Sequence, residues 1–275
     1  SPNRDLTVSA HLFSDVAPMV RGQFRTFEDK GAAQLTAYAT YSNRVSTTTG
    51  VTSGTDAFRG YVDGSGKFQF TPNWSASASL RVATDRTFLR RYDISRDDRL
   101  RSTFALERID ADSYFSFAGW ATQTLRTGDR QGLQPIALPE VDYRLRLTDP
   151  VLGGTAQLQA NTLMIGRTSG QDTRRAFGLA RWDKRAITGL GQELTLTALA
   201  RGDVYHSDEN ASTIEAIYRG ESGWHGRGTV AAAAEMRWPF VGKAFGNATQ
   251  ILTPRLQLVG TKTTGNLEVP NEDSR

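Results

Sequence analysis

The sequence contains no cysteine, three histidines and no long apolar run, and each of these features narrows what the protein can be. Without cysteine there is neither a disulfide framework nor a thiolate metal site, although this does not assign a compartment. His11, His206 and His225 share no metal-ligand spacing, so no metal site is expected. No stretch approaches the roughly 18–20 apolar residues that a membrane-spanning helix requires.

Clustered charge is also absent. The 275 residues include 33 basic and 29 acidic side chains, a formal net charge of +4, spread along the chain. Proteins that bind nucleic acid gather their basic residues on one surface, so no nucleic-acid partner is expected. Residues 1–10 lack the pattern of a secretory leader, and we expect either a cytoplasmic protein or part of a longer one. No catalytic constellation or cofactor motif is found: "GESGW" at 220–224 departs from a nucleophile elbow at its last position.

What is present is alternation. Mean hydropathy is −0.44, which is low for a large soluble core, but a membrane β-barrel escapes this test because each strand is only half apolar. In "WSASASLRVA" at 74–83, tryptophan, alanine, leucine and valine alternate with serine and arginine. The same period of two recurs from end to end, whereas helical periodicity is nearly absent. The pattern predicts an all-β protein.

About thirteen strands are predicted, most of them longer than the strands of ordinary globular sheets. Their approximate spans are 3–13, 18–28, 33–44, 57–70, 74–84, 100–110, 113–125, 137–148, 155–166, 174–184, 192–206, 226–239 and 248–261. Tight turns alternate with longer loops, which is the layout of an outer-membrane barrel with short periplasmic turns and long external loops. We therefore predict an antiparallel transmembrane β-barrel meander. Because bacterial single-chain barrels have even strand numbers, thirteen strands indicate an incomplete barrel.

The polar residues of these strands are too hydrophilic for a dry protein core and suit a solvated lumen. The candidate lumen-lining residues are Arg81, Arg144, Arg146, Gln157, Gln159, Arg201, Glu235 and Arg237. Leucine, alanine and valine on the opposite face are expected to contact lipid, with aromatic residues near strand ends as an interfacial girdle.

Five segments dispersed over the chain together resemble the LptD family of lipopolysaccharide-assembly outer-membrane proteins, in its α-proteobacterial form. These segments are "SPNRDLTVSA" at 1–10, the run at 59–95, "LPEVDYRLRLTDPVLGGTAQLQAN" at 138–161, "LARGDVYH" at 199–206 and "VPNEDSR" at 269–275. The resemblance implies that residues 1–275 form a single domain, the first half of the family's barrel. It would lack the periplasmic jelly-roll domain and the closing half.

The resemblance also implies a function. The family inserts lipopolysaccharide into the outer leaflet of the Gram-negative outer membrane, and it makes or breaks no bond. Implied partners are an LptE-type lipoprotein plug in the lumen, an LptA-type periplasmic bridge reached through the jelly roll, lipopolysaccharide and outer-membrane lipid. No cofactor and no enzymatic activity are implied.

The exit for such a lipid must be a seam between the first and last strands. The family carries prolines in its earliest strands, and Pro2 matches one of them, whereas Ala10 stands where a second would follow. Proline lacks the N–H of a ladder bond, and Asn3 and Asp5 make a polar start to the strand, so these residues are candidates for a lateral gate. An ordinary proline at the start of a strand is the alternative interpretation of Pro2.

Two alternatives remain open. A porin or other channel would show the same periodicity without the resemblance, and a soluble all-β binding module would be soluble without detergent.

For a barrel, we predict that the loop at 85–99 is external and that Arg90, Arg91 and Asp93 pair with neighbouring loops. The competing expectation is a disordered, solvated loop.

Overall fold

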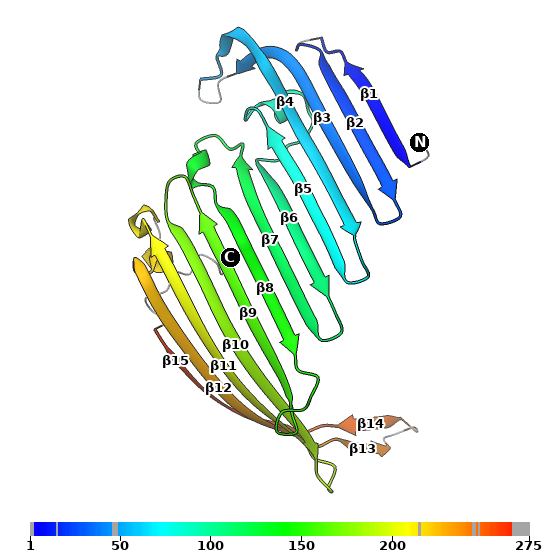
Figure 1. Cartoon of the computed structure of the whole chain (residues 1–275), viewed down its shortest axis with the longest axis vertical. Helices are drawn as coiled ribbons and strands as arrows, with labels where there is room; N and C mark the ends of the chain where they lie inside the picture. The colour runs from blue at the N-terminus through cyan, green and yellow to red at the C-terminus, as the bar shows by residue number, and fades with distance from the viewer. Residues whose placement is uncertain are drawn as a thin grey trace. The chain divides into compact units, whose positions relative to one another are not determined.

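The computed structural model describes residues 3–14, 16–45, 49–213, 216–243, 246 and 248–265. Within this part of the chain, one antiparallel sheet holds thirteen strands in chain order, and a two-stranded ribbon lies apart from it (Figure 1). The all-β meander predicted from the alternation is therefore confirmed.

The strands of the main sheet follow one another without crossovers, as expected when each antiparallel pair is joined by a local connection. They are β1 (Arg4–His11), β2 (Met19–Glu28), β3 (Gly31–Val45), β4 (Thr52–Gln69), β5 (Trp74–Ala83), β6 (Arg99–Ile109), β7 (Ser113–Thr124), β8 (Ile136–Arg146), β9 (Thr155–Gly166), β10 (Asp172–Ile187), β11 (Glu193–Asp208), β12 (Gly223–Arg237) and β15 (Arg255–Thr264). Short helical turns interrupt the connections: α1 (Phe88–Arg91), η1 (Gln131–Leu133), η2 (Asn210–Ser212) and α2 (Ala216–Arg219).

The last predicted strand, 248–261, is wrong in its bounds. The structure divides this segment between β14 (Thr249–Leu252) and β15, and β14 pairs with β13 (Phe240–Lys243) instead of joining the main sheet. Pro254 lies at the break, where a residue without an N–H cannot continue a ladder. The apolar residues on either side of that proline made two strands look like one.

The two edges of the main sheet are open. Among the described residues, β1 pairs only with β2, and β15 pairs only with β12. The sheet is thus not closed, in agreement with the incomplete barrel expected from the odd number of strands.

Most connections alternate along the chain between short and long, although the one at 167–171, in a long position, has only five residues. The short ones lie at 29–30, 70–73, 110–112, 147–154 and 188–192, and longer ones lie at 84–98, 125–135 and 209–222. At the turn that follows β8, Leu152 and Gly153 both have positive φ, 51° and 72°, as a type I′ hairpin turn requires. The Trp182 indole N–H donates to the Val151 carbonyl (2.7 Å) and fixes this turn against β10.

The chain divides into two compact units. Unit 1 comprises Ser1–Ile109, Ser116–Glu140 and Leu163–Asp172, and unit 2 comprises Asp110–Phe115, Val141–Thr162 and Thr173–Arg275. Each unit contains one polar and one apolar sheet face, described separately below.

Candidate functional site: the polar face of the sheet

The register of unit 1 sorts polar and apolar residues onto opposite faces. One row of directly paired residues runs Asp5, Arg25, Gln34, Ser65, Ser79 and Thr103 from β1 to β6. The adjacent row runs Leu6, Phe24, Leu35, Gly64 and Leu80 from β1 to β5. Because successive side chains of a strand point to opposite faces, these rows define a polar face and an apolar face.

A hollow of about 730 Å³ lies beside the first strand in unit 1, and Asn3 and Asp5 are among its lining residues. The carboxylate of Asp5 forms an ion pair with Arg25 on β2. Farther along the hollow, the Ser79 and Thr103 hydroxyls share a hydrogen bond of 2.8 Å. Hydroxyl groups both donate and accept, so this pair of side chains can contact the hydroxyl groups of a sugar.

The predicted gate residues meet different outcomes. Asn3 contributes its backbone carbonyl, which accepts the Phe27 N–H at 2.8 Å, and Asp5 lies on the polar face. Pro2 lies outside the described residues. Arg4, which lies between Asn3 and Asp5 in the sequence, points to the other face and pairs with Glu28 at 2.9 Å.

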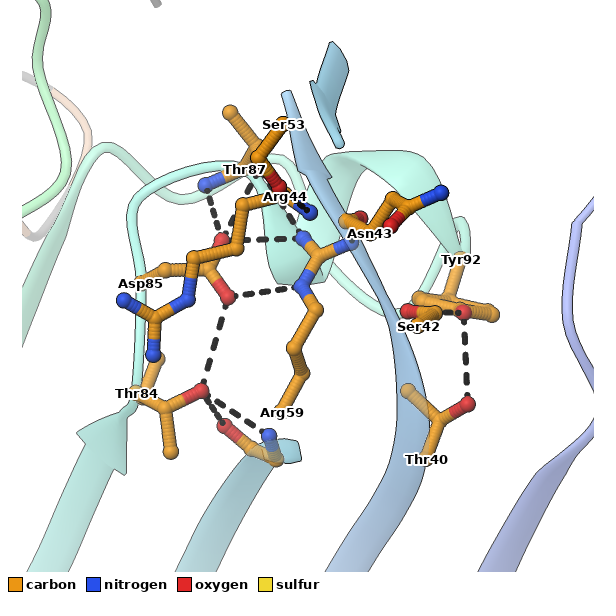
Figure 2. A network of polar contacts seen from close by, with 12 residues as sticks. Thr40, Ser42, Asn43, Arg44, Ser53, Arg59, Thr84, Asp85, Thr87 and Tyr92 are labelled. Carbon is orange, nitrogen blue, oxygen red and sulfur yellow. Dashed lines mark hydrogen bonds and ion pairs between the residues drawn. The ribbon is translucent and has the colours of Figure 1, made fainter. Parts of the chain in front are cut away.

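At the long-loop end of β4, a buried arginine holds the loop at 84–98. Arg59 is fully buried; its Nε and Nη2 donate to the two Asp85 carboxylate oxygens at 2.8 and 2.9 Å. Nη2 also donates to the Thr87 hydroxyl (2.9 Å), and Nη1 donates to the Asn43 carbonyl (3.0 Å). Figure 2 shows this bidentate arrangement, which is the geometry that gives arginine–carboxylate pairs their strength.

Apolar packing holds the same loop. Phe88 and Leu89 of α1 are fully buried, and with Tyr92 they join a cluster with strand residues such as Met19 and Tyr61. Tyr61 pairs with Tyr38 and lies two residues from Asp63, which places it on the polar face. The loop therefore folds onto the polar face of unit 1 and covers its long-loop end.

The two acidic anchors of this loop are held ionised. Burial raises the pKa of Asp85, but hydrogen bonds from Arg59 and Thr87 outweigh this effect and keep it below its ordinary value. A hydrogen bond from Arg81 and a second from Ser95 lower the pKa of the more exposed Asp97.

The residues predicted to order this loop are not the ones that do so. Within the described residues, Arg90, Arg91 and Asp93 form no ion pair with a neighbouring loop. Order comes instead from Asp85 and Asp97, which reach back to arginines on the strands. The sequence did not predict these contacts, because the dense charge of "RRYD" at 90–93 suggested ion pairs there. The burial of Phe88 and Leu89 is a tertiary contact.

Unit 2 gathers positive charge on its polar face. The Asp203 side chain is fully buried and accepts from Arg201 (2.5 Å) and from Arg227 (3.2 Å). Arg201 lies over the Phe177 ring, with 3.8 Å from its guanidinium carbon to the ring centroid. Arg175 lies within electrostatic range of all three charged groups. Three guanidinium groups around one carboxylate leave an excess of positive charge, which can hold a phosphate or a carboxylate.

The other candidate lumen residues form local ion pairs and hydrogen bonds. On β8, Arg144 pairs with Asp142 (2.6 Å), which also accepts from Gln159 at 2.8 Å. Glu235 on β12 pairs with Arg237 (2.5 Å) and with Arg255 of β15. By alternation, Arg146 and Gln157 share the faces of Arg144 and Gln159.

Arg81 brings several groups together in unit 1. It pairs with Asp63 (3.3 Å) and Asp97 (2.5 Å) and donates to the Tyr61 hydroxyl (3.0 Å). Sequence reasoning named Arg81 and Arg201 but missed Arg59, Arg175 and Arg227. A signal existed for Arg227, which alternates in phase with Thr229, Glu235 and Arg237.

Across the described residues, no group of three or more histidine or acidic side chains is arranged to hold a metal ion. The same residues contain no helix long and apolar enough to cross a membrane.

A match to a known protein family shows which family the chain belongs to. The sequence profile of the family described as "LptD: LPS transport system D" matches residues 57–275. The chain belongs to the LptD family. LptD proteins are outer-membrane β-barrel proteins of Gram-negative bacteria that transport lipopolysaccharide, so this is a transport family and not a family of enzymes. No curated protein sequence matches the chain.

Proposed function

We propose that this chain forms the first half of an LptD-type barrel and that lipopolysaccharide leaves the barrel sideways, between β1 and the closing strand. The observation that carries the proposal is the position of β1. Its outer edge is unpaired in the described chain, and Asp5 on its polar face borders the hollow beside it. A glycolipid whose sugars occupy a polar lumen must pass such an edge to reach the bilayer.

The two faces of the sheet suit the two parts of this substrate. The polar face, including Arg81, Arg144, Arg146, Gln157, Gln159, Arg201, Glu235 and Arg237, lines the lumen and contacts sugars. The cationic surplus around Asp203 suits the anionic groups of the lipid. The apolar face, with Leu6 and Leu80 at 69% and 47% exposure, contacts bilayer lipid.

The partners follow from the same proposal. An LptE-type lipoprotein occupies the lumen as a plug, and an LptA-type bridge delivers lipopolysaccharide through a jelly-roll domain outside this chain. The resembling segments at 59–95 and 138–161 are the ground for proposing the α-proteobacterial form of the family. A porin would share the alternation, but the family match does not favour it.

The seam opens at modest cost if few ladder bonds cross it. Each intact hydrogen bond contributes only about 0.5–1.5 kcal/mol net, so a seam that lacks several of them is weak. Pro2 removes one donor, and the polar start of β1 at Asn3 and Asp5 is poorly suited to a ladder buried in lipid.

A reversible cross-link tests lateral exit in cells that carry the full-length protein. A cysteine at Thr7 and another on the closing strand should lock the seam, stop lipopolysaccharide from reaching the cell surface, and restore it on reduction. The matched control is Thr7→Cys with Gln23→Cys, which joins two residues already paired between β1 and β2. Export should survive this control, since β1 and β2 need not separate. Normal surface lipopolysaccharide with the seam fully cross-linked would show that lateral exit is wrong.

A further inference from the structure

The ribbon formed by β13 and β14 interrupts the main sheet between β12 and β15. It lies beyond the ends of those two strands (Figure 1). Across its base, the backbone N–H of Trp238 donates to the Pro254 carbonyl (3.0 Å). The register pairs Phe240 with Leu252 and Val241 with Ile251. This connection is at the short-turn end of β12, where the other connections have two to eight residues.

Both faces of the ribbon carry apolar side chains that the described protein leaves uncovered. Phe240 and Leu252 share one face and are 45% and 68% exposed; Val241 and Ile251 share the other and are 71% and 69% exposed. A solvated sheet face normally carries polar residues, and a two-stranded ribbon alone is marginally stable in water. Two exposed apolar faces therefore indicate a nonaqueous environment around the ribbon.

The chemistry of the segment favours lipid over a protein partner. Residues 238–254 contain no aspartate or glutamate, and their single charged residue is Lys243. Protein interfaces usually have a polar rim, whereas an apolar surface with a lone cation suits the phosphate-bearing headgroups of a bilayer. Lys243 pairs with Thr249, farther from the base than the two apolar pairs. In the described ribbon, the apolar pairs thus lie next to the base and the one charged residue lies farther out.

The base of the ribbon continues the lipid-facing surface of unit 2. On β15, Leu256 and Leu258 are 58% and 67% exposed on the apolar face. Trp238 packs against Phe240 (5.0 Å between ring centroids), and its indole N–H donates to the Leu190 carbonyl at 3.1 Å. Tryptophan is enriched at membrane–water interfaces, where an apolar ring and a polar N–H meet both environments. Trp238 therefore marks a membrane boundary at which the ribbon begins.

We propose that the β13–β14 ribbon is a membrane-interface anchor that inserts into phospholipid of the periplasmic leaflet. Two apolar rows extend roughly 7 Å at about 3.3 Å per residue, which matches the depth of roughly 5–10 Å reached by interfacial segments. Lys243 then lies at the level of the lipid phosphates. This anchor does not depend on lateral release of lipopolysaccharide.

Photo-crosslinking of the full-length protein tests the anchor. The protein is placed in nanodiscs of phosphatidylethanolamine and phosphatidylglycerol, with p-benzoylphenylalanine in place of Ile251 or Val241. Leu258, on the apolar face, is the positive control, and Thr195, in the β11 row opposite Glu235, is the negative control. We expect phospholipid adducts by intact mass at Ile251, Val241 and Leu258, and none at Thr195.

Cross-links from Ile251 and Val241 to protein, with lipid captured at Leu258, would overturn the anchor in favour of a protein partner such as a periplasmic domain. The absence of any adduct at Ile251 and Val241 would also overturn it. If Leu258 captures no lipid either, the anchor fails together with the lipid-facing assignment of this face. Normal export of lipopolysaccharide in cells would not support the anchor in any of these cases, because the anchor and lateral release are separate proposals.

Discussion

At the scale of single residues, Arg59 shows how a charged side chain is accommodated without solvent. Four hydrogen bonds to Asp85, Thr87 and Asn43 satisfy its guanidinium group. A buried ion pair gives little net stability compared with apolar residues, but removing one partner leaves an uncompensated charge. The pair therefore acts chiefly as a specific connection between β4 and the loop at 84–98.

Asp85→Asn should release this loop. The variant leaves buried Arg59 without its carboxylate, and breaking such a pair costs about 3–5 kcal/mol. Hydrogen–deuterium exchange of residues 84–98 in the full-length protein should rise sharply. The matched control is Asp97→Asn in the same loop, whose carboxylate is 48% exposed and whose loss should cost about 1 kcal/mol or less. Equal effects of the two variants would contradict the role of Asp85.

The pH dependence of the same exchange provides a second check. The pKa of Asp85 is lowered in the folded protein, so its stabilisation is fully present above the ordinary value of about 3.9. That stabilisation is lost as the pH falls through the lowered folded pKa. Protection of residues 84–98 should therefore persist from neutral pH to about pH 4 and fall only below it. In Asp85→Asn this acid-dependent step should shrink to the smaller part that the more exposed Asp97 contributes.

At the scale of elements, the alternation decides which face of a strand is polar, and close backbone contacts decide how the strands pack. A Cβ at Gly31, where β3 begins, would collide with the backbone carbonyl of Lys67 and lie 2.7 Å from the Phe68 Cα on β4. Neither atom belongs to a flexible side chain that could move aside. The start of β3 thus depends on a residue without a side chain.

Gly31→Ala should reduce the folded fraction of the full-length protein. The added methyl group forces the β3–β4 pair apart, and overpacking of this kind costs about 1–3 kcal/mol. Heat-dependent mobility on a gel separates folded from unfolded barrel protein and measures the effect. Gly22→Ala in β2 is the matched control, because a Cβ there meets nothing within 4 Å. A folded fraction as high in Gly31→Ala as in Gly22→Ala would refute the packing argument.

At the scale of the whole molecule, the open edges at β1 and β15 decide whether the sheet can be stable in a membrane. Within the described chain neither edge has a partner, and unpaired backbone groups in hydrocarbon each cost several kcal/mol. This is why we propose that the chain is the first half of a larger barrel. That it forms a single domain stays a prediction.

The 275-residue chain expressed alone should therefore fail to form a stable monomer in a membrane mimic. In detergent it should aggregate or associate through its edges, whereas the full-length protein should give a folded monomer with heat-dependent gel mobility. Size-exclusion chromatography with circular dichroism measures both outcomes. A stable, folded monomer of the isolated chain would mean that β1 and β15 pair with each other, and the half-barrel proposal would fail.

The sequence by itself determined the class of fold, because a period of two is a local property that each strand carries independently. It placed Arg81 and Leu80 on opposite faces and gave nearly all strand positions, since the turns carry local signals such as Pro72-Asn73. Family membership was also indicated by motifs spread along the chain, and the family match confirmed it.

The tertiary structure alone decided which side chains meet. Arg59 finds Asp85 at 26 residues' separation, and Arg227 finds Asp203 at 24, across pairings that periodicity does not specify. The loop at 84–98 folds onto the polar face because Phe88 and Leu89 bury themselves against strand residues, which local charge concealed. The β13–β14 ribbon likewise depends on pairing: alternation on either side of Pro254 indicates strands, but only the folded structure decides that β14 pairs with β13 while β15 pairs with β12.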